Sequence, residues 1–187
     1  DYKYKMVTNP LDEDVWVKAA EIIPGDRSVL HHVITTFGEL ETEGRRAGKL
    51  KRGTGGGLGG YVPGAIGKPF PEDTGILLPA GATIEFQMHY TPAGVATTDA
   101  SRLGLYLYKQ PPKHKLDSMI LLNPRILIPA GAPNHSEVMA RTFNEDVLVY
   151  SLLPHAHYRG KASEFVAHFP DGLSLIHISE PTRQHHI

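Results

Sequence analysis

Histidine is the residue type whose abundance in this sequence points most directly to chemistry. The 187 residues include 11 histidines and no cysteine. Imidazole is the commonest protein ligand for transition metals and suits copper, zinc, iron and nickel. The lack of cysteine excludes disulfides, thiolate zinc sites, iron–sulfur clusters, c-type haem attachment and cysteine nucleophiles. A metal site built from histidine is therefore the chemistry to expect first.

Two histidines late in the chain have a spacing that suits a shared metal ion. His155 and His157 occur in the segment LLPHAHYRGK. Residues at positions i and i+2 of a β-strand point to the same face, so both side chains can bind one ion without backbone distortion. The same His-x-His spacing also occurs in cupins and zinc hydrolases, and two partly exposed histidines without a metal are the alternative.

The adjacent pair His31 and His32, in SVLHHVITTF, is harder to place on one metal ion. Successive strand residues face opposite sides, so both side chains can bind one ion only where the strand twists strongly, bulges or ends. Taken alone, the pair is better explained by coincidence than by metal binding. His89, in IEFQMHYTPAG, is likewise better explained as a buried histidine with a hydrogen-bond partner. Spacing alone assigns no role to these three residues.

The segments that carry these histidines are typical of an all-β protein. Short apolar runs alternate with Gly, Pro, Asn and Asp, and the 19 glycines and 15 prolines would interrupt long helices. The nearest helix candidate, Asp12–Ala20, is equally compatible with a strand after a turn. The expected strands are Val15–Val17, Val29–Thr36, Ile84–Tyr90, Leu103–Tyr108, Val147–Leu153 and Ser163–Phe169.

A short repeat bears on the number of domains. Leu78–Ala82 reads LPAGA and Ile128–Ala132 reads IPAGA, each followed by a strand-like segment. The repeat fits either two similar turns in one sheet or two related β-sandwich domains. Gln110–Lys113, with the sequence QPPK, is the best linker candidate between the two copies. We expect an N-terminal domain over residues 1–110 and a C-terminal domain over residues 113–172.

A charged and then glycine-rich stretch lies between Glu39 and Gly60. Gly55, Gly57 and Gly60 match the pattern G-x-G-x-x-G, but a Tyr-Val-Pro-Gly sequence follows where a phosphate-binding helix would have to begin. The stretch therefore indicates a surface loop rather than a phosphate site.

Composition and charge exclude two classes of partner. The chain is 41% hydrophobic and 21% charged, as in an ordinary globular protein, and its formal net charge is -1. That balance gives no electrostatic indication of nucleic-acid binding. No run approaches the roughly 18 apolar residues of a membrane helix. We expect neither a nucleic-acid partner nor a membrane partner.

The last residues have an unusual origin. Leu173–Arg183 reads LSLIHISEPTR, which is the in-frame translation of a transposase adapter used to build sequencing libraries. We therefore expect residues 173–187 to be an artefactual tail and the authentic sequence to end near Gly172, with a natural tail as the alternative. The histidines of this stretch are accordingly given no role: His177, His185 and His186.

The order and context of the three histidine motifs resemble a known family. DEDVWVKAAEIIPGDRSVLHHV, LLPAGATIEFQMHYTPAG and PHAHYRGK resemble segments of the copper type II ascorbate-dependent monooxygenases, the family of peptidylglycine hydroxylating monooxygenase and dopamine β-monooxygenase. The resemblance is greatest to their bacterial relatives and runs from Met6 to Gly172. It implies two antiparallel jelly-roll β-sandwich domains with one copper ion each, the second domain being truncated in this chain.

The resemblance also implies roles for five histidines. His31, His32 and His89 match the ligands of the first copper, which transfers electrons. His155 and His157 match two ligands of the second, catalytic copper, which binds dioxygen. In the family, ascorbate or another one-electron donor reduces both ions and a C–H bond of a small-molecule substrate is hydroxylated. The family also implies a periplasmic or secreted location and admits an upstream electron-transfer domain.

The sequence departs from the family pattern in three respects. The methionine that completes the second copper site in the family would lie beyond Gly172. Leu153 stands where the peptide-amidating branch has an arginine that binds the substrate carboxylate. The animal enzymes are rich in disulfides, whereas this chain contains no cysteine. We therefore expect a monooxygenase fragment that binds copper but is itself inactive. A non-catalytic copper-binding β-sandwich protein and a cupin-type zinc or iron enzyme are the alternatives.

Overall fold

The chain is an all-β protein, as its sequence predicts. The computed structural model describes residues 1–51, 54–64, 67, 69–119, 121, 123–152, 154 and 160–179, with the backbone alone for 177–179. These residues contain β-strands and a single 3-10 turn, η1 (Gly44–Arg46), but no α-helix. Within this described part, no helix has the length and hydropathy needed to cross a membrane. The chain divides into two compact units, Asp1–Leu122 and Asn123–Ile187.

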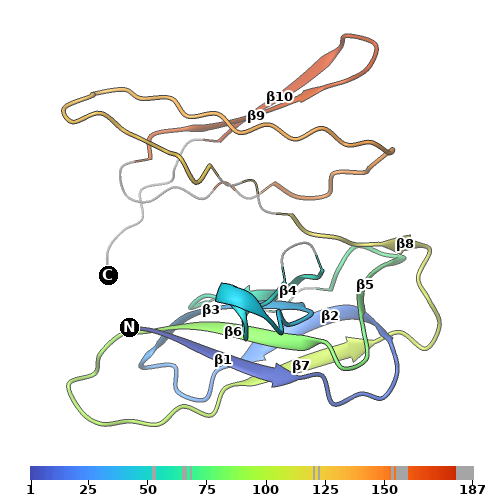
Figure 1. Cartoon of the computed structure of the whole chain (residues 1–187), viewed down its shortest axis with the longest axis vertical. Coiled ribbons are helices and arrows are strands. Elements are labelled where there is room, and N and C mark those ends of the chain that lie inside the picture. The colour runs from blue at the N-terminus through green and yellow to red at the C-terminus, as the bar shows by residue number, and fades with distance from the viewer. Residues whose placement is uncertain are drawn as a thin grey trace. The chain divides into compact units, whose positions relative to one another are not determined.

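The first unit contains two four-stranded sheets, with the strand orders β1-β6-β3-β4 and β7-β2-β5-β8 (Figure 1). Neighbouring strands are antiparallel except β5 and β8, which are parallel. Of the helix candidate Asp12–Ala20, residues 15–20 lie in β2 and residues 12–14 precede it, which is the alternative of a strand after a turn. The bounds are β1 Tyr2–Thr8, β2 Val15–Ile23, β3 Leu30–Gly38, β4 Gly56–Tyr61, β5 Thr74–Leu78, β6 Thr83–Tyr90, β7 Arg102–Leu107 and β8 His114–Lys115.

The two sheets pack against each other around shared apolar side chains. Val17 and Leu78 of one sheet are fully buried and lie in one cluster with Phe37, Leu58 and Ile84 of the other. Alternate residues of each strand point inward, so these strands present one apolar face to the core and one face to solvent. A second cluster extends this core towards the start of β3: Ile22, Leu30, Val33, Tyr61 and Met88.

The glycine-rich segment forms a strand, and the surface loop expected from its sequence is wrong for residues 56–61. These residues are β4, which pairs with β3. A Cβ atom at Gly60 would lie 2.4 Å from the carbonyl oxygen of Val33, so this close approach requires glycine. Leu58, the apolar residue within the glycine run, is 1% exposed and fixes the strand to the core.

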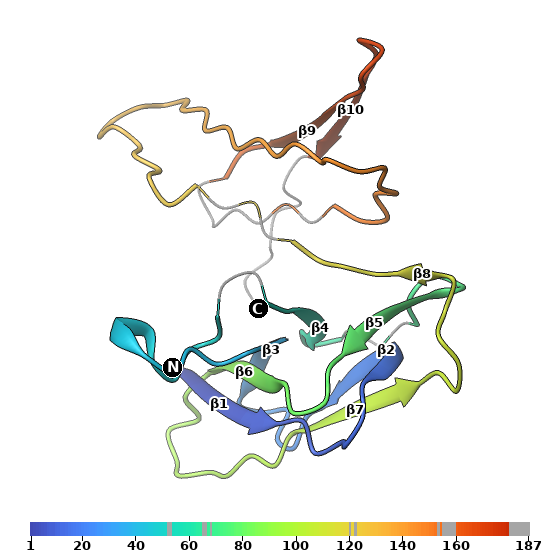
Figure 2. The same cartoon turned by 45° about the vertical axis from the view of Figure 1, so that its right-hand side comes forward.

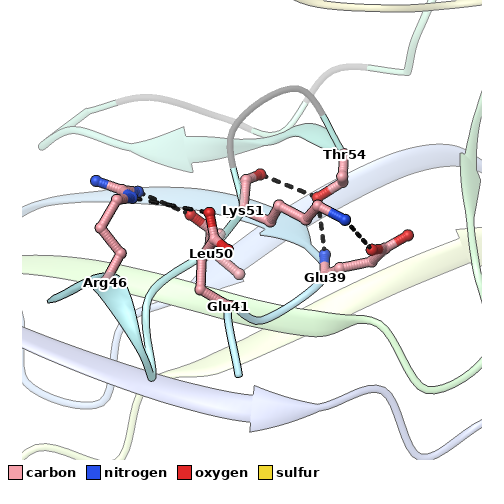
Figure 3. A network of polar contacts seen from close by, with 6 residues as sticks. All are labelled: Glu39, Glu41, Arg46, Leu50, Lys51 and Thr54. Atoms are coloured by element: carbon pink, nitrogen blue, oxygen red, sulfur yellow. Dashed lines mark hydrogen bonds and ion pairs between the residues drawn. The ribbon is translucent and has the colours of Figure 1, made fainter. Parts of the chain in front are cut away.

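Polar contacts close the connection between β3 and β4 (Figure 3). The Arg46 guanidinium donates a hydrogen bond of 3.0 Å to the carbonyl oxygen of Leu50 and lies 3.9 Å from the Glu41 carboxylate. Lys51 Nζ lies 3.4 Å from the carboxylate of Glu39. The Lys51 pair is solvent-exposed and adds little stability. The connection therefore folds back on itself beyond the last residue of β3, whereas the His31–His32 pair lies at the first residues of that strand.

The second unit contains one hairpin among its described residues (Figure 2). β9 (Ser163–His168) pairs in antiparallel fashion with β10 (Ser174–Ser179). β10 lies in the stretch expected to be an artefactual tail, and its leucine and isoleucine residues favour a strand whatever their origin. Apolar side chains elsewhere in this unit are exposed, with Leu127 at 76% and Leu148 at 96%. A second jelly-roll domain stays a prediction.

The short repeat forms the same turn in both units. Gly81 and Gly131 have φ angles of 66° and 75°. In each turn the alanine after the glycine donates to the proline carbonyl oxygen, at 3.3 and 3.2 Å. The predicted linker, Gln110–Lys113, connects β7 to β8 and so lies inside the first unit. The predicted domains, residues 1–110 and 113–172, stay a prediction.

Candidate metal centre

Three histidines converge at one end of the paired strands β3 and β6. His31 and His32 are the second and third residues of β3, and His89 is the penultimate residue of β6. Nδ1 of His32 lies 3.0 Å from Nδ1 of His31 and 3.3 Å from Nδ1 of His89. Candidate ligand nitrogens of all three residues lie within 4.8 Å of one another. Ligands about 2.0–2.1 Å from one ion are separated by roughly these distances. We call this group the histidine triad.

A β-bulge brings the two adjacent histidines to one face of the sheet. Leu30 and His32 pair with consecutive residues of β6, so His31 is an extra residue in β3. Leu30 is 1% exposed and Val33 is 2% exposed, and both point into the core. Leu30 and Val33 therefore point inward, and the two histidines between them both lie on the outer face of the sheet. Of the three backbone conditions that the sequence left open, the structure has a bulge, and it lies near the beginning of the strand.

An aromatic side chain covers one edge of the triad. Tyr2 pairs with His89 across β1 and β6, and their rings stack with centroids 4.4 Å apart and an interplanar angle of 7°. The same ring meets His32 edge-on at 6.0 Å. His31 is exposed, whereas His32 and His89 are half-buried. Sequence reasoning missed Tyr2, although the alternation of Tyr, Lys and Met in YKYKM is a strand signal that places Tyr2 on one face.

The electrostatic surroundings favour a neutral imidazole at His89. Burial lowers the pKa of His89. Positive charge on the α-amino group of Asp1 and on the His31 ring acts in the same direction. Neutral imidazole is the form that binds a metal ion, so a lowered pKa reduces competition from protons. The donor set is three imidazole groups without a carboxylate, which fits copper or zinc.

The second predicted site falls outside the residues that the structure describes. This holds for His155 and His157 and for Leu153, the position discussed for substrate binding. Of the histidines without a predicted role, His114 lies in β8 and His168 in β9, and neither belongs to the triad.

Comparison with known proteins does not place the chain in a family. No protein-family model matches the sequence, and no curated protein is significantly similar to it. The candidate site therefore rests on the geometry of the triad and on the chemistry of imidazole.

Proposed function

We propose that the histidine triad binds a copper ion, and that the chain is part of a copper-dependent monooxygenase. The observation that carries the copper site is the convergence of His31, His32 and His89 at Nδ1 separations of 3.0 and 3.3 Å. A β-bulge brings the adjacent residues there, and bulges are over-represented next to active sites. The resemblance of the three histidine motifs to the ascorbate-dependent enzymes supports the reaction class.

Copper suits the three-imidazole ligand set and is the divalent first-row ion that nitrogen sites generally bind most tightly. Imidazole binds both oxidation states of copper, and the affinity of nitrogen sites for divalent ions is highest at copper. The triad contains no carboxylate that would favour magnesium, calcium or manganese. Zinc is the main competitor, so the experiment must compare the two ions directly.

The chain's own residues would hold and orient the ion. His32 and His89 are half-buried on two hydrogen-bonded strands, and the stacked Tyr2 ring restricts rotation of the His89 imidazole. His31 is exposed, which leaves the site open to solvent on its side. Bound copper supplies one-electron chemistry, because it cycles between Cu(I) and Cu(II).

The rest of the reaction depends on the second site. His155 and His157 would hold the catalytic copper, where dioxygen and a small-molecule substrate would meet, with ascorbate or a similar donor as the reductant. The same proposal includes two jelly-roll domains and a periplasmic or secreted location. These elements rest on the sequence resemblance alone.

Copper titration of the purified chain tests the first site. We expect His32→Ala and His89→Ala each to weaken copper binding by at least about 100-fold, because each removes one of three ligands and 100-fold is the upper end of the loss for residues that only orient ligands. His114→Ala is the matched control, since His114 is exposed and lies outside the triad. Electron paramagnetic resonance should show nitrogen coupling from the triad. An unchanged affinity in both triad variants, or preference for zinc over copper, would contradict the proposal.

A second titration separates the monooxygenase from its alternatives. If His31→Ala and His155→Ala remove two independent copper sites, the two-copper enzyme is supported. If the two substitutions affect one shared site, the proposal is wrong. If His31→Ala leaves zinc or iron binding intact while His155→Ala abolishes it, a cupin-type enzyme is the better account.

A further inference from the structure

Two loops leave the end of the sheet that carries the histidine triad, and hydrogen bonds join them. Residues 24–29 precede β3 and its bulge. Residues 91–101 follow β6, which ends at Tyr90, the residue after His89. The loops are distant in sequence, yet Thr91 N–H donates to the carbonyl oxygen of Val29 at 2.8 Å. A Cβ atom on Gly25 would lie 2.4 Å from the backbone nitrogen of Ala100, so the contact between the loops is close.

The carboxylate of Asp99 is the centre of this contact. Its Oδ2 accepts a hydrogen bond of 2.7 Å from the Tyr90 hydroxyl, and its Oδ1 accepts one of 2.9 Å from the backbone N–H of Asp26. The hydroxyl of Ser101 also donates to it, at 2.9–3.0 Å. Asp99 is half-buried, and hydrogen bonds to a carboxylate are stronger than neutral ones. One side chain thus connects the end of β6 to the loop before β3.

Each end of this connection is itself fixed. At one end, the half-buried Tyr90 hydroxyl lies 3.4 Å from the Met88 sulfur in addition to its hydrogen bond with Asp99. On the other side, the Asp26 carboxylate accepts hydrogen bonds from Ser28 N–H at 2.9 Å and from the Thr97 hydroxyl at 3.0 Å. The Asp26 carbonyl oxygen accepts one of 3.1 Å from Leu30 N–H, at the residue before the bulge.

We propose that Asp99 is a positioning residue for the metal centre, since it fixes the separation between the bulge that carries His31 and His32 and the strand end that carries His89. The inference rests on the proposed copper site. The three ligands come from two strands, so their spacing depends on what holds the strand ends together. Core packing of Leu30 and Val33 keeps the bulge itself, but without the Asp99 connection the loop before β3 and the end of β6 can move relative to each other, and the ligand nitrogens with them. Ligands held in place before binding give a tighter site.

Two substitutions test the proposal on the full chain. Tyr90→Phe removes one hydroxyl and keeps the ring, whereas Asp99→Asn keeps the shape and removes the charge. We expect copper affinity to fall about tenfold in each, the lower end of the range for residues that orient metal ligands. Their copper paramagnetic resonance spectra should differ from that of the wild type. Tyr106→Phe is the matched control, because the Tyr106 hydroxyl makes only a 3.4 Å contact with Glu21.

The spectrum separates positioning from a general loss of stability. A purely structural role would lower the melting temperature while the copper spectrum and affinity of the folded protein stayed as in the wild type, and that result would overturn the inference. Tyr90→Phe remains informative even where Asp99→Asn fails to fold, because it deletes a single oxygen atom. A wild-type chain that binds no copper would refute the proposed function instead, so the two failures are distinguishable.

Discussion

Each of the two compact units contains a turn of the same sequence and geometry, but the surroundings of the two turns differ. In the first unit, Leu78 precedes the Pro-Ala-Gly-Ala turn and is 0% exposed. In the second unit, Ile128 precedes the same turn and is 56% exposed. Both glycines have positive φ angles, and both turns close with the same hydrogen bond. The local sequence therefore determines the turn, whereas burial depends on partner strands that only the first turn has among the described residues.

This difference bears on where a rigid metal site can form. In the described part of the chain, the buried hydrophobic residues all lie in Asp1–Leu122. The strands that carry the histidine triad are backed by this core, through Leu30, Val33 and Met88. Close packing limits the positions that the ligand-bearing strands can adopt. The first unit thus provides a packed scaffold for the proposed metal site.

Matched core substitutions should give the largest difference between the units. Leu78→Ala leaves a cavity in the shared core and should lower the free energy of unfolding by about 2–5 kcal/mol. Ile128→Ala removes an exposed side chain and should change it by less than about 0.5 kcal/mol. Urea denaturation followed by far-ultraviolet circular dichroism, which reports on the strands of both units, measures both changes. Fluorescence of Trp16 in β2, the single tryptophan of the chain, follows the first unit alone. Equal effects would show that Ile128 is buried as Leu78 is.

Matched turn substitutions should give a smaller difference. Gly81→Ala places a side chain at a φ of 66° and should cost about 1–2 kcal/mol in the same denaturation experiment. Neither glycine has a neighbouring atom that a Cβ would contact, so backbone strain is the cause. Gly131→Ala carries the same strain but should leave the Trp16 transition unchanged, because that turn is outside the first unit. A shift of this transition in Gly131→Ala would show that the units unfold together.

A pH effect at His89 should be the smallest. The pKa of His89 is lowered from the ordinary value of 6.5 in the folded protein. As the pH falls towards and below 6.5, the ring therefore binds fewer protons in the folded protein than in the unfolded protein. Stability of the metal-free first unit should therefore fall as the pH drops from 7.5 towards 5.5. The decrease in melting temperature should be smaller in His89→Gln, which cannot titrate. An identical pH dependence in the two proteins would count against the contribution of His89.

The sequence predicts the class of fold better than the details of the site. Gly and Pro between short apolar runs suffice to indicate strands, because these residues act locally. The site depends on pairings that span the chain, such as Tyr2 with His89 and Asp99 with Asp26. Glycine is required at position 60 because the backbone of β3 lies so close to it. This contact cannot be read from the sequence. A strand was therefore mistaken for a loop.

The histidine pair shows the same limit in a single strand. The sequence alone indicates that His31 and His32 need a twist, a bulge or a strand end, but it does not choose among them. The choice follows from Leu30 and Val33, which both reach the core although an odd spacing separates them. Two inward residues three positions apart require one extra residue between them. Recognising that both are buried requires the packed sheets.

The bulge also suggests how such a site can arise and disappear. Removing His31 from β3 would leave Leu30, His32 and Val33 in regular alternation, each still opposite its present partner in β6. The sheet would keep its register and its core, and would lose only a ligand. A single-codon insertion or deletion at this position therefore changes the proposed site between two histidines and three while the strand pairing stays the same. Ancestry of the scaffold and ancestry of the metal site can accordingly differ.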